Sequence, residues 1–204
     1  MPDDTPELVV PDAAAWRDWL SEHADDHRGV WLLLAKKGTT TPTCLTYPQA
    51  LEEALCQGWI DGQTRRVDDG TYRQRYTPRR VRSLWSRRNV DHVARLTAEG
   101  RMRPRGLAEV ARAQRDGRWD AAYAGPATIE VPEELAAALR AEPAAQALFD
   151  RLDGQNRYAV LHRVTTAVGA ATRARRVATY VAMLAGGRTP YPQRGLTPPD
   201  GAQG

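Results

Sequence analysis

Residues 59–78 read WIDGQTRRVDDGTYRQRYTP, and this run predicts a β-hairpin. Asp69-Gly70 near its middle is a strong signal for a two-residue type I′ turn. Such a turn would place Arg66 directly opposite Arg73. Because opposed arginines repel, the two side chains either extend into water or share an anion.

Helix and strand signals alternate upstream of the hairpin. Tryptophans recur at helical spacing after an aspartate N-cap, which predicts a first helix over residues 12–23. The unbroken apolar run at residues 30–35 predicts a buried strand. A capping-box pattern at Thr46–Gln49 predicts a second helix that ends at Gly58.

Downstream of the hairpin the pattern is helical. Ser83 or Ser86 is expected to cap a helix that ends near Gly100, and Pro104 is expected to begin another. The remaining expected helices cover residues 132–140, 143–152, 155–168 and 172–184.

These signals predict an α+β fold, with a small antiparallel sheet and packed helices followed by an all-helical C-terminal part. We expect an α+β domain at residues 1–125 that contains the basic hairpin, and a helical domain at 126–186. Residues 187–204 are rich in Gly and Pro and are predicted to form a disordered tail.

The composition of the 204 residues excludes several classes of protein. Hydrophobic residues make up 42% of the chain, which is enough for a core at this length. Cys44 and Cys56 form neither a disulfide framework nor a metal-binding spacing. The start of the chain has no apolar signal region, and no stretch approaches the roughly 20 apolar residues of a membrane span. We therefore expect a cytoplasmic protein with no membrane partner.

Motifs for cofactors and for known catalytic centres are absent from the sequence. It contains no P-loop, dinucleotide-binding, GxSxG, HExxH or zinc-finger spacing. No cofactor, metal site or catalytic residue is therefore expected, and the oligomeric state stays open.

Positive charge is concentrated between residues 64 and 89. This segment holds nine arginines against Asp68 and Asp69, a local charge of +7 in a chain whose net charge is +4. Arginine binds carboxylates and phosphates in a bidentate manner, so the segment could attract an anionic ligand or nucleic acid. The alternative is a solvated surface balanced by acidic residues elsewhere.

Polar and aromatic residues gather in two short segments, one on each side of the hairpin. We expect them to form a ligand-binding pocket from Trp59, Asp61, Arg79, Ser83, Trp85, Ser86 and Asn89. Asp61 could act as an acid or base, but a carboxylate near arginines more often stays ionised and anchors one of them, here Arg79. A Cys56–His nucleophilic pair is the other possibility, but nothing in the sequence places a histidine near Cys56.

Short motifs run through the chain in a recognisable order. In the N-terminal part they are GVWL at 29–32, KK at 36–37, ALCQGWIDG at 54–62, YTPRR at 76–80, SLWS at 83–86 and GRW at 117–119. In the C-terminal part they are VP at 131–132 and TRARR at 172–176 before an apolar helix. With these motifs the sequence resembles the YdeI/OmpD-associated family of bacteriocin-protection proteins, and its C-terminal part resembles that family's small helical OmdA-type domain.

The resemblance implies protection against antimicrobial peptides or envelope stress, and it implies no established reaction. One departure concerns the helix before Thr172, where the family usually has an Ala-Lys pair and this chain has Ala167-Val168.

Three hypotheses about function remain open at this point. The preferred one is a non-enzymatic protective or stress-associated protein that binds an anionic or aromatic small molecule or a peptide. The second is a nucleic-acid-binding protein that acts through Arg65–Arg88. The third is an enzyme acting on a toxic metabolite, with Asp61 or Cys56 in the chemistry.

Overall fold

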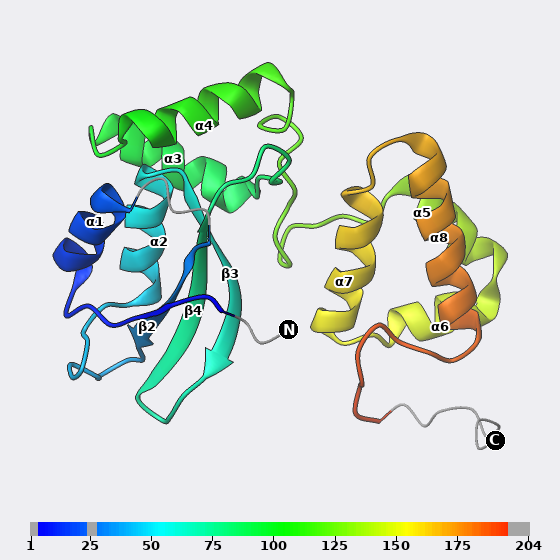
Figure 1. The fold of residues 1–204 in the computed structure, drawn as a ribbon. Coiled ribbons are helices and arrows are strands. Elements are labelled where there is room, and N and C mark those ends of the chain that lie inside the picture. The colour runs from blue at the N-terminus through cyan, green and yellow to red at the C-terminus, as the bar shows by residue number, and fades with distance from the viewer. Residues whose placement is uncertain (1–3, 24–27, 196–204) are drawn as a thin grey trace. The chain divides into compact units, whose positions relative to one another are not determined.

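The structure is a computed structural model that describes residues 4–23 and 28–195. The chain divides into two compact units, residues 1–122 and residues 123–204. Within the described residues it forms eight α-helices and one four-stranded sheet (Figure 1). The predicted α+β class is therefore confirmed.

The sheet of the first unit contains the strands β1 (Glu7–Leu8), β2 (Val30–Ala35), β3 (Trp59–Arg66) and β4 (Thr71–Pro78). Their order across the sheet is β1-β2-β4-β3. The pairs β2–β4 and β3–β4 are antiparallel, but β1 runs parallel to β2. The sheet is therefore mixed rather than purely antiparallel. The sequence gives no sign of β1, because two residues are too short to show an alternating pattern.

One face of this sheet is covered by helices α1 (Ala13–Glu22) and α2 (Tyr47–Cys56) (Figure 1). The core between the sheet and these helices contains alternate residues of β2, Trp16 of α1 and Tyr76 of β4. Helices α3 (Arg87–Ala98) and α4 (Pro104–Arg115) share a second core with the other side of α2.

The turn of the β3–β4 hairpin differs from the predicted two-residue turn. Arg65, not Arg66, is paired with Arg73, so the register is shifted by one residue. The backbone φ of Gly70 is not positive, and a type I′ turn requires a positive φ there. The Asp68 carboxylate closes the turn instead, because it accepts hydrogen bonds from the backbone N–H of Gly70 and Thr71.

A β-bulge interrupts β3 near its start. Asp61 is paired with Tyr76 and Thr64 with Gln74. Gly62 and Gln63 therefore lie opposite the single residue Arg75. The Gln74 side chain donates a 2.7 Å hydrogen bond to the Gly62 carbonyl and a 3.4 Å one to the Gln63 carbonyl. These bonds satisfy carbonyl groups that the bulge removes from the regular ladder.

The second unit is helical. Its helices are α5 (Glu133–Ala141), α6 (Pro143–Asp150), α7 (Gly154–Thr165) and α8 (Ala170–Ala185), as Figure 1 shows. Their core contains leucines from α5, α6 and α7 packed against Tyr180 of α8. Each predicted helix in this region is confirmed, with its ends within a few residues.

The segment after α8 was predicted to be disordered, and this is wrong for residues 188–195. Tyr191 donates its backbone N–H to the buried Asn156 side chain at 2.8 Å. The Gln193 side chain accepts from the Asp153 backbone at 2.9 Å and donates to the Arg151 carbonyl at 2.8 Å. The rest of the predicted tail, residues 196–204, lies outside the described residues.

No helix in the described part of the chain has both the length and the apolar character needed to cross a membrane.

Candidate functional site

Trp59 and Asp61 extend from β3 toward the helix-covered face of the sheet. The Trp59 indole is fully buried and packs edge-on against Trp16 and Trp19 of α1. Asp61 accepts a 3.0 Å hydrogen bond from the Tyr47 hydroxyl of α2. Burial, followed by the charge of Asp61, raises the pKa of Tyr47, so this phenol stays protonated and remains a donor.

Arg79 and Trp85 lie in the other core of the unit. The Arg79 guanidinium stacks on the Trp85 ring, with its central carbon 3.5 Å from the ring centroid. It also donates to the Leu84 carbonyl at 3.1 Å. Trp85 in turn packs against Trp119. An indole face thus holds this guanidinium, and the expected anchoring of Arg79 by Asp61 stays a prediction.

The predicted pocket walled by Trp59 and Trp85 does not form, because the two indoles are buried in separate cores. Ser86 accepts from the backbone N–H of Asn89 and thus caps α3, and Asn89 is itself buried. Of the predicted residues, Ser83 borders the groove that is described below.

Cys56 is a packing residue. It is almost fully buried at the end of α2, next to Leu55 and Trp85 in the second core. Burial raises the pKa of its thiol to about 11, with a smaller contribution from the charge of Glu53. A thiol that stays protonated is a poor nucleophile, which argues against a catalytic role for Cys56.

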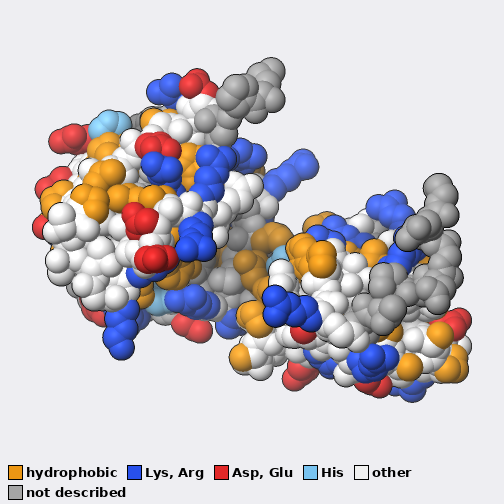
Figure 2. Space-filling view, turned by 90° about the horizontal axis from the view of Figure 1, so that it is seen from below, with side chains coloured by type: hydrophobic (Ala, Val, Ile, Leu, Met, Phe, Trp, Pro, Cys, Tyr) orange, Lys and Arg blue, Asp and Glu red, His pale blue; other side chains and the backbone are white. Residues whose placement is uncertain are grey.

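Most arginines of the basic segment have partners within the fold. Figure 2 shows that Lys and Arg side chains gather over one side of the first unit. Five of the nine arginines lie against an acidic or aromatic side chain: Arg65 on Trp31, Arg66 with Asp69, Arg73 with Glu7, Arg79 on Trp85 and Arg88 near Tyr47. A high arginine count therefore overstates the charge that this surface offers to a ligand.

An open groove of about 350 Å³ lies where the bulge of β3 meets the turn after β4. We call it the bulge groove. It is lined by Gly62, Gln63, Arg75, Thr77, Arg80 and Ser83.

Local structure explains how these residues come together. Arg75 and Thr77 alternate with Tyr76 along β4, so they point away from the helix-covered face. A tight turn brings Arg80 beside Ser83, because the Ser83 hydroxyl accepts the Arg80 backbone N–H at 2.9 Å. The Ser83 carbonyl is held at 2.8 Å by Arg118.

Two cations of the bulge groove, Arg75 and Arg80, have no acidic partner in the part of the chain that the structure describes. Within the described residues, no ion pair involves Arg75 or Arg80. The Arg75 side chain donates a long 3.4 Å bond to the Arg28 carbonyl, while its buried Nε has no acceptor among those residues. An anion in the groove would supply such an acceptor, since a guanidinium presents several N–H groups in one plane.

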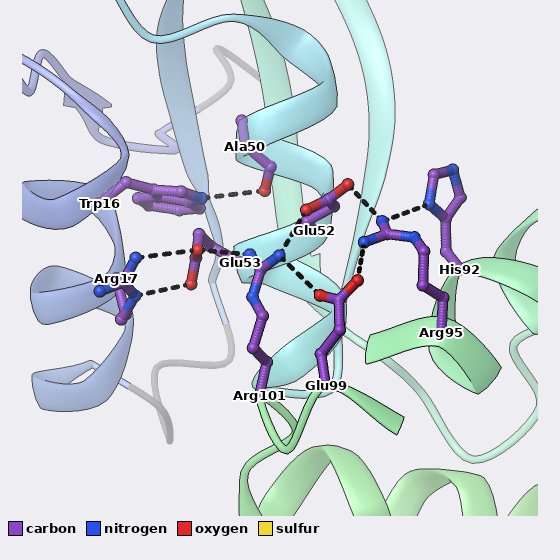
Figure 3. A network of polar contacts seen from close by, with 9 residues as sticks. All are labelled: Trp16, Arg17, Ala50, Glu52, Glu53, His92, Arg95, Glu99 and Arg101. Atoms are coloured by element: carbon purple, nitrogen blue, oxygen red, sulfur yellow. Dashed lines mark hydrogen bonds and ion pairs between the residues drawn. The ribbon is translucent and has the colours of Figure 1, made fainter. Parts of the chain in front are cut away.

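A second charged cluster links α1, α2 and α3, and it is drawn in Figure 3. Glu53 of α2 accepts two hydrogen bonds from Arg17 and one, at 2.8 Å, from Arg101. Arg101 also bonds Glu52 at 2.8 Å, and Glu52 reaches Arg95 of α3. Positive and negative groups balance one another here, so the cluster connects helices and does not present a free charge.

The bulge groove was not found by sequence reasoning. Arg75 and Arg80 were recognised only as members of the basic segment, and the bulge was not predicted. The one available signal was Gly62, since a glycine within a strand often marks a bulge.

Comparison with known families separates the two parts of the chain. Residues 8–109 match the family model described as a domain of unknown function (DUF8412). Residues 128–187 match the model OmdA, described as bacteriocin-protection, YdeI or OmpD-associated. The resemblance to the OmdA-type domain is thereby confirmed for the C-terminal part, while the N-terminal part matches a different model. No curated protein and no solved structure matches the chain.

Proposed function

Because the chain belongs to the DUF8412 family through residues 8–109 and carries an OmdA domain at 128–187, we propose that it is a non-enzymatic, bacteriocin-protection-like protein. In this proposal the first unit binds a small molecule or peptide by its carboxylate or phosphate group. The binding site is the bulge groove, with Arg75 and Arg80 as the cationic residues and Ser83 as a neutral hydroxyl.

The observation that carries the proposal is the pair of arginines in one groove for which the described residues supply no acidic partner. Charge-assisted hydrogen bonds to an anion are roughly twice as strong as neutral ones. The aromatic part of the predicted ligand has less support, because neither Trp59 nor Trp85 reaches a groove surface. A non-enzymatic role is consistent with the inert thiol of Cys56 and with Asp61 being held by a tyrosine hydroxyl.

Binding can be tested with inorganic pyrophosphate as the anionic probe, by calorimetry on the full chain. Arg80→Ala and Arg75→Ala are each expected to weaken binding about tenfold, which corresponds to the loss of a charge-assisted hydrogen bond. Arg82→Ala is the matched control, because Arg82 is exposed on the same turn but does not line the groove.

Protection is then tested in a sensitive bacterial strain that expresses either the wild type or a variant. We expect Arg80→Ala to lose protection against a bacteriocin and Arg82→Ala to keep it, at equal amounts of folded protein. Equal survival with both variants would show that the groove is not the protective site.

A further inference from the structure

The second unit contains a cavity of about 460 Å³ on the side of α7. We call it the α7 pocket. It is lined by Pro126, Gly154, Gln155, Tyr158, Ala159, His162, Arg163 and Tyr191. Its volume lies within the range of about 300–1,000 Å³ that small-molecule sites occupy.

Flat rings supply much of the pocket wall. Tyr158 and His162 are one helical turn apart on α7, with ring centroids 5.4 Å from each other. The ring of Tyr123, which does not line the pocket, packs edge-on against His162 at 4.6 Å and supports it. Such walls favour a planar apolar ligand, which can stack against them with little loss of conformational entropy.

Another part of the wall, at Tyr191, comes from the segment after α8. Tyr191 belongs to the segment that the sequence suggested would be disordered. Its backbone is fixed by the Asn156 side chain, and Asn156 is fully buried. Gln193 adds a further bond to Asn156 at 3.2 Å. The Asn156 side chain therefore fixes this part of the pocket wall through hydrogen bonds to Tyr191 and Gln193.

Arg163 is the single permanently charged residue among those that line the pocket. Its hydrogen bond goes to the neutral Tyr180 hydroxyl at 2.8 Å, and no ion pair of the described residues includes it. The hydrogen bond to Tyr180 is the largest of the effects that raise the pKa of Arg163, so its charge is permanent. The pocket thus combines aromatic walls with one cation that lacks a carboxylate.

His162 does not add a second positive charge at neutral pH. Burial lowers its pKa, and the nearby charges of Arg163 and Arg176 lower it further. The neutral imidazole can donate or accept one hydrogen bond beside the ligand ring.

From this combination we propose that the α7 pocket binds a planar aromatic monocarboxylate. The ring lies against Tyr158 and Tyr191, and the carboxylate pairs with the Arg163 guanidinium. This site belongs to the OmdA unit and does not depend on the bulge groove of the first unit.

The test measures two probes of the same shape by calorimetry on the full chain: 2-naphthoate and the uncharged 2-naphthalenemethanol. The wild type is expected to bind the acid about tenfold more tightly than the alcohol, because only the acid pairs with Arg163. Arg163→Met is expected to remove this preference. Arg175→Met is the matched control, since Arg175 is an exposed arginine of α8 that does not line the pocket.

A second variant tests the position of the site. Gln155 is exposed at the edge of the pocket, so Gln155→Trp fills the cavity without entering the core, and it is expected to weaken both probes. Circular dichroism melts verify that each variant is folded.

The inference is overturned by equal binding of both probes to the wild type, by no binding at millimolar concentration, or by equal effects of Arg163→Met and Arg175→Met. Arg80→Ala is expected to leave naphthoate binding unchanged. If Arg80→Ala weakens it, the acid occupies the bulge groove and the α7 pocket is not its site.

Discussion

At the scale of single residues, the two cysteines differ in their exposure to solvent. Cys44 is exposed, whereas Cys56 is buried with its pKa raised to about 11. Iodoacetamide at neutral pH is therefore expected to modify Cys44 and to leave Cys56 unmodified, because the reactive species is an accessible thiolate. Mass spectrometry of tryptic peptides measures the modification at each site.

The control is the same reaction in concentrated guanidinium chloride, where both thiols should react. Rapid modification of Cys56 in the native protein would contradict its burial and would reopen the hypothesis that it serves as a nucleophile.

Trp59 illustrates why a side chain's role could not be derived from its neighbours in the sequence. The motif around it suggested a pocket wall, because tryptophan has both an apolar body and a polar edge. In the fold, Trp16 and Trp19 come from a helix some forty residues away along the chain and enclose the indole. The residues next to Trp59 in the sequence carry no information about such distant partners. From the sequence alone, an aromatic residue of the core cannot be distinguished from one that lines a pocket.

At the scale of secondary-structure elements, helix ends were predictable because capping is local. Thr46 and Gln49 form the predicted capping box, and Asp12 caps α1 as expected. The register of the hairpin was not predictable in the same way. It depends on whether Asp68 or the backbone of Asp69-Gly70 closes the turn, and the side chain of Asp68 does so.

Contact between α2 and α4 depends on Gly106. A Cβ at this position would overlap the Cys56 carbonyl group and come within 3.0 Å of the Leu55 carbonyl oxygen. Gly106→Ala is therefore expected to destabilise the protein by about 1–3 kcal/mol, although alanine favours a helix by about 1 kcal/mol. Urea denaturation followed by tryptophan emission measures the change.

Gly154→Ala provides the comparison for this effect. Gly154 begins α7, and a Cβ there would meet no atom within 4 Å. Its replacement should leave stability unchanged or raise it slightly, as judged by the amide circular dichroism of the full chain. An equally stable Gly106→Ala variant would mean that α4 can move away from α2 at no cost.

The ion network of Figure 3 is expected to stabilise the packing of α2 against its neighbours. Arg101→Ala removes the hydrogen bonds to Glu52 and Glu53, while Arg17 still pairs with Glu53. We expect a loss of about 1–2 kcal/mol at pH 7, between the values typical of exposed and of buried pairs. Arg140→Ala removes a pair on an exposed helix surface and should have almost no effect.

The effect of Arg101→Ala should depend on pH in a defined direction. Burial alone would raise the pKa of Glu52, but hydrogen bonds from Arg101 and Arg95 outweigh burial and lower it. The stabilisation is therefore complete above the ordinary glutamate pKa of 4.5 and is lost as the pH falls below it toward the folded-state value. Urea titrations at several pH values would refute this if the difference between wild type and variant grew as the solution became more acidic.

At the scale of the whole molecule, the order of the helices and of strands β2 to β4 could be predicted, whereas the bulge groove and the α7 pocket could not. Periodicity and capping indicated every helix, and the C-terminal motifs indicated the OmdA domain. The bulge groove depends on one inserted residue in β3, and the α7 pocket depends on a Gly- and Pro-rich segment held by Asn156. Both cavities depend on tertiary contacts, and the composition of a segment does not show which tertiary contacts it makes.

Each of the three core clusters draws its residues from one unit, and this arrangement has a consequence for folding. All six tryptophans lie in the first unit, between Trp16 and Trp119, so tryptophan emission follows that unit alone. A fragment of residues 1–122 is expected to unfold in urea with the same emission midpoint as the full chain.

Leu161→Ala should lower the stability of the second unit by about 2–5 kcal/mol, measured by circular dichroism on a fragment of residues 123–204. The same substitution should leave the emission midpoint of the full chain unchanged, because Leu161 contributes to no core that contains a tryptophan. A lower midpoint in that variant would show that the units fold cooperatively, and stability would then have to be assigned to the chain as a whole rather than to its parts.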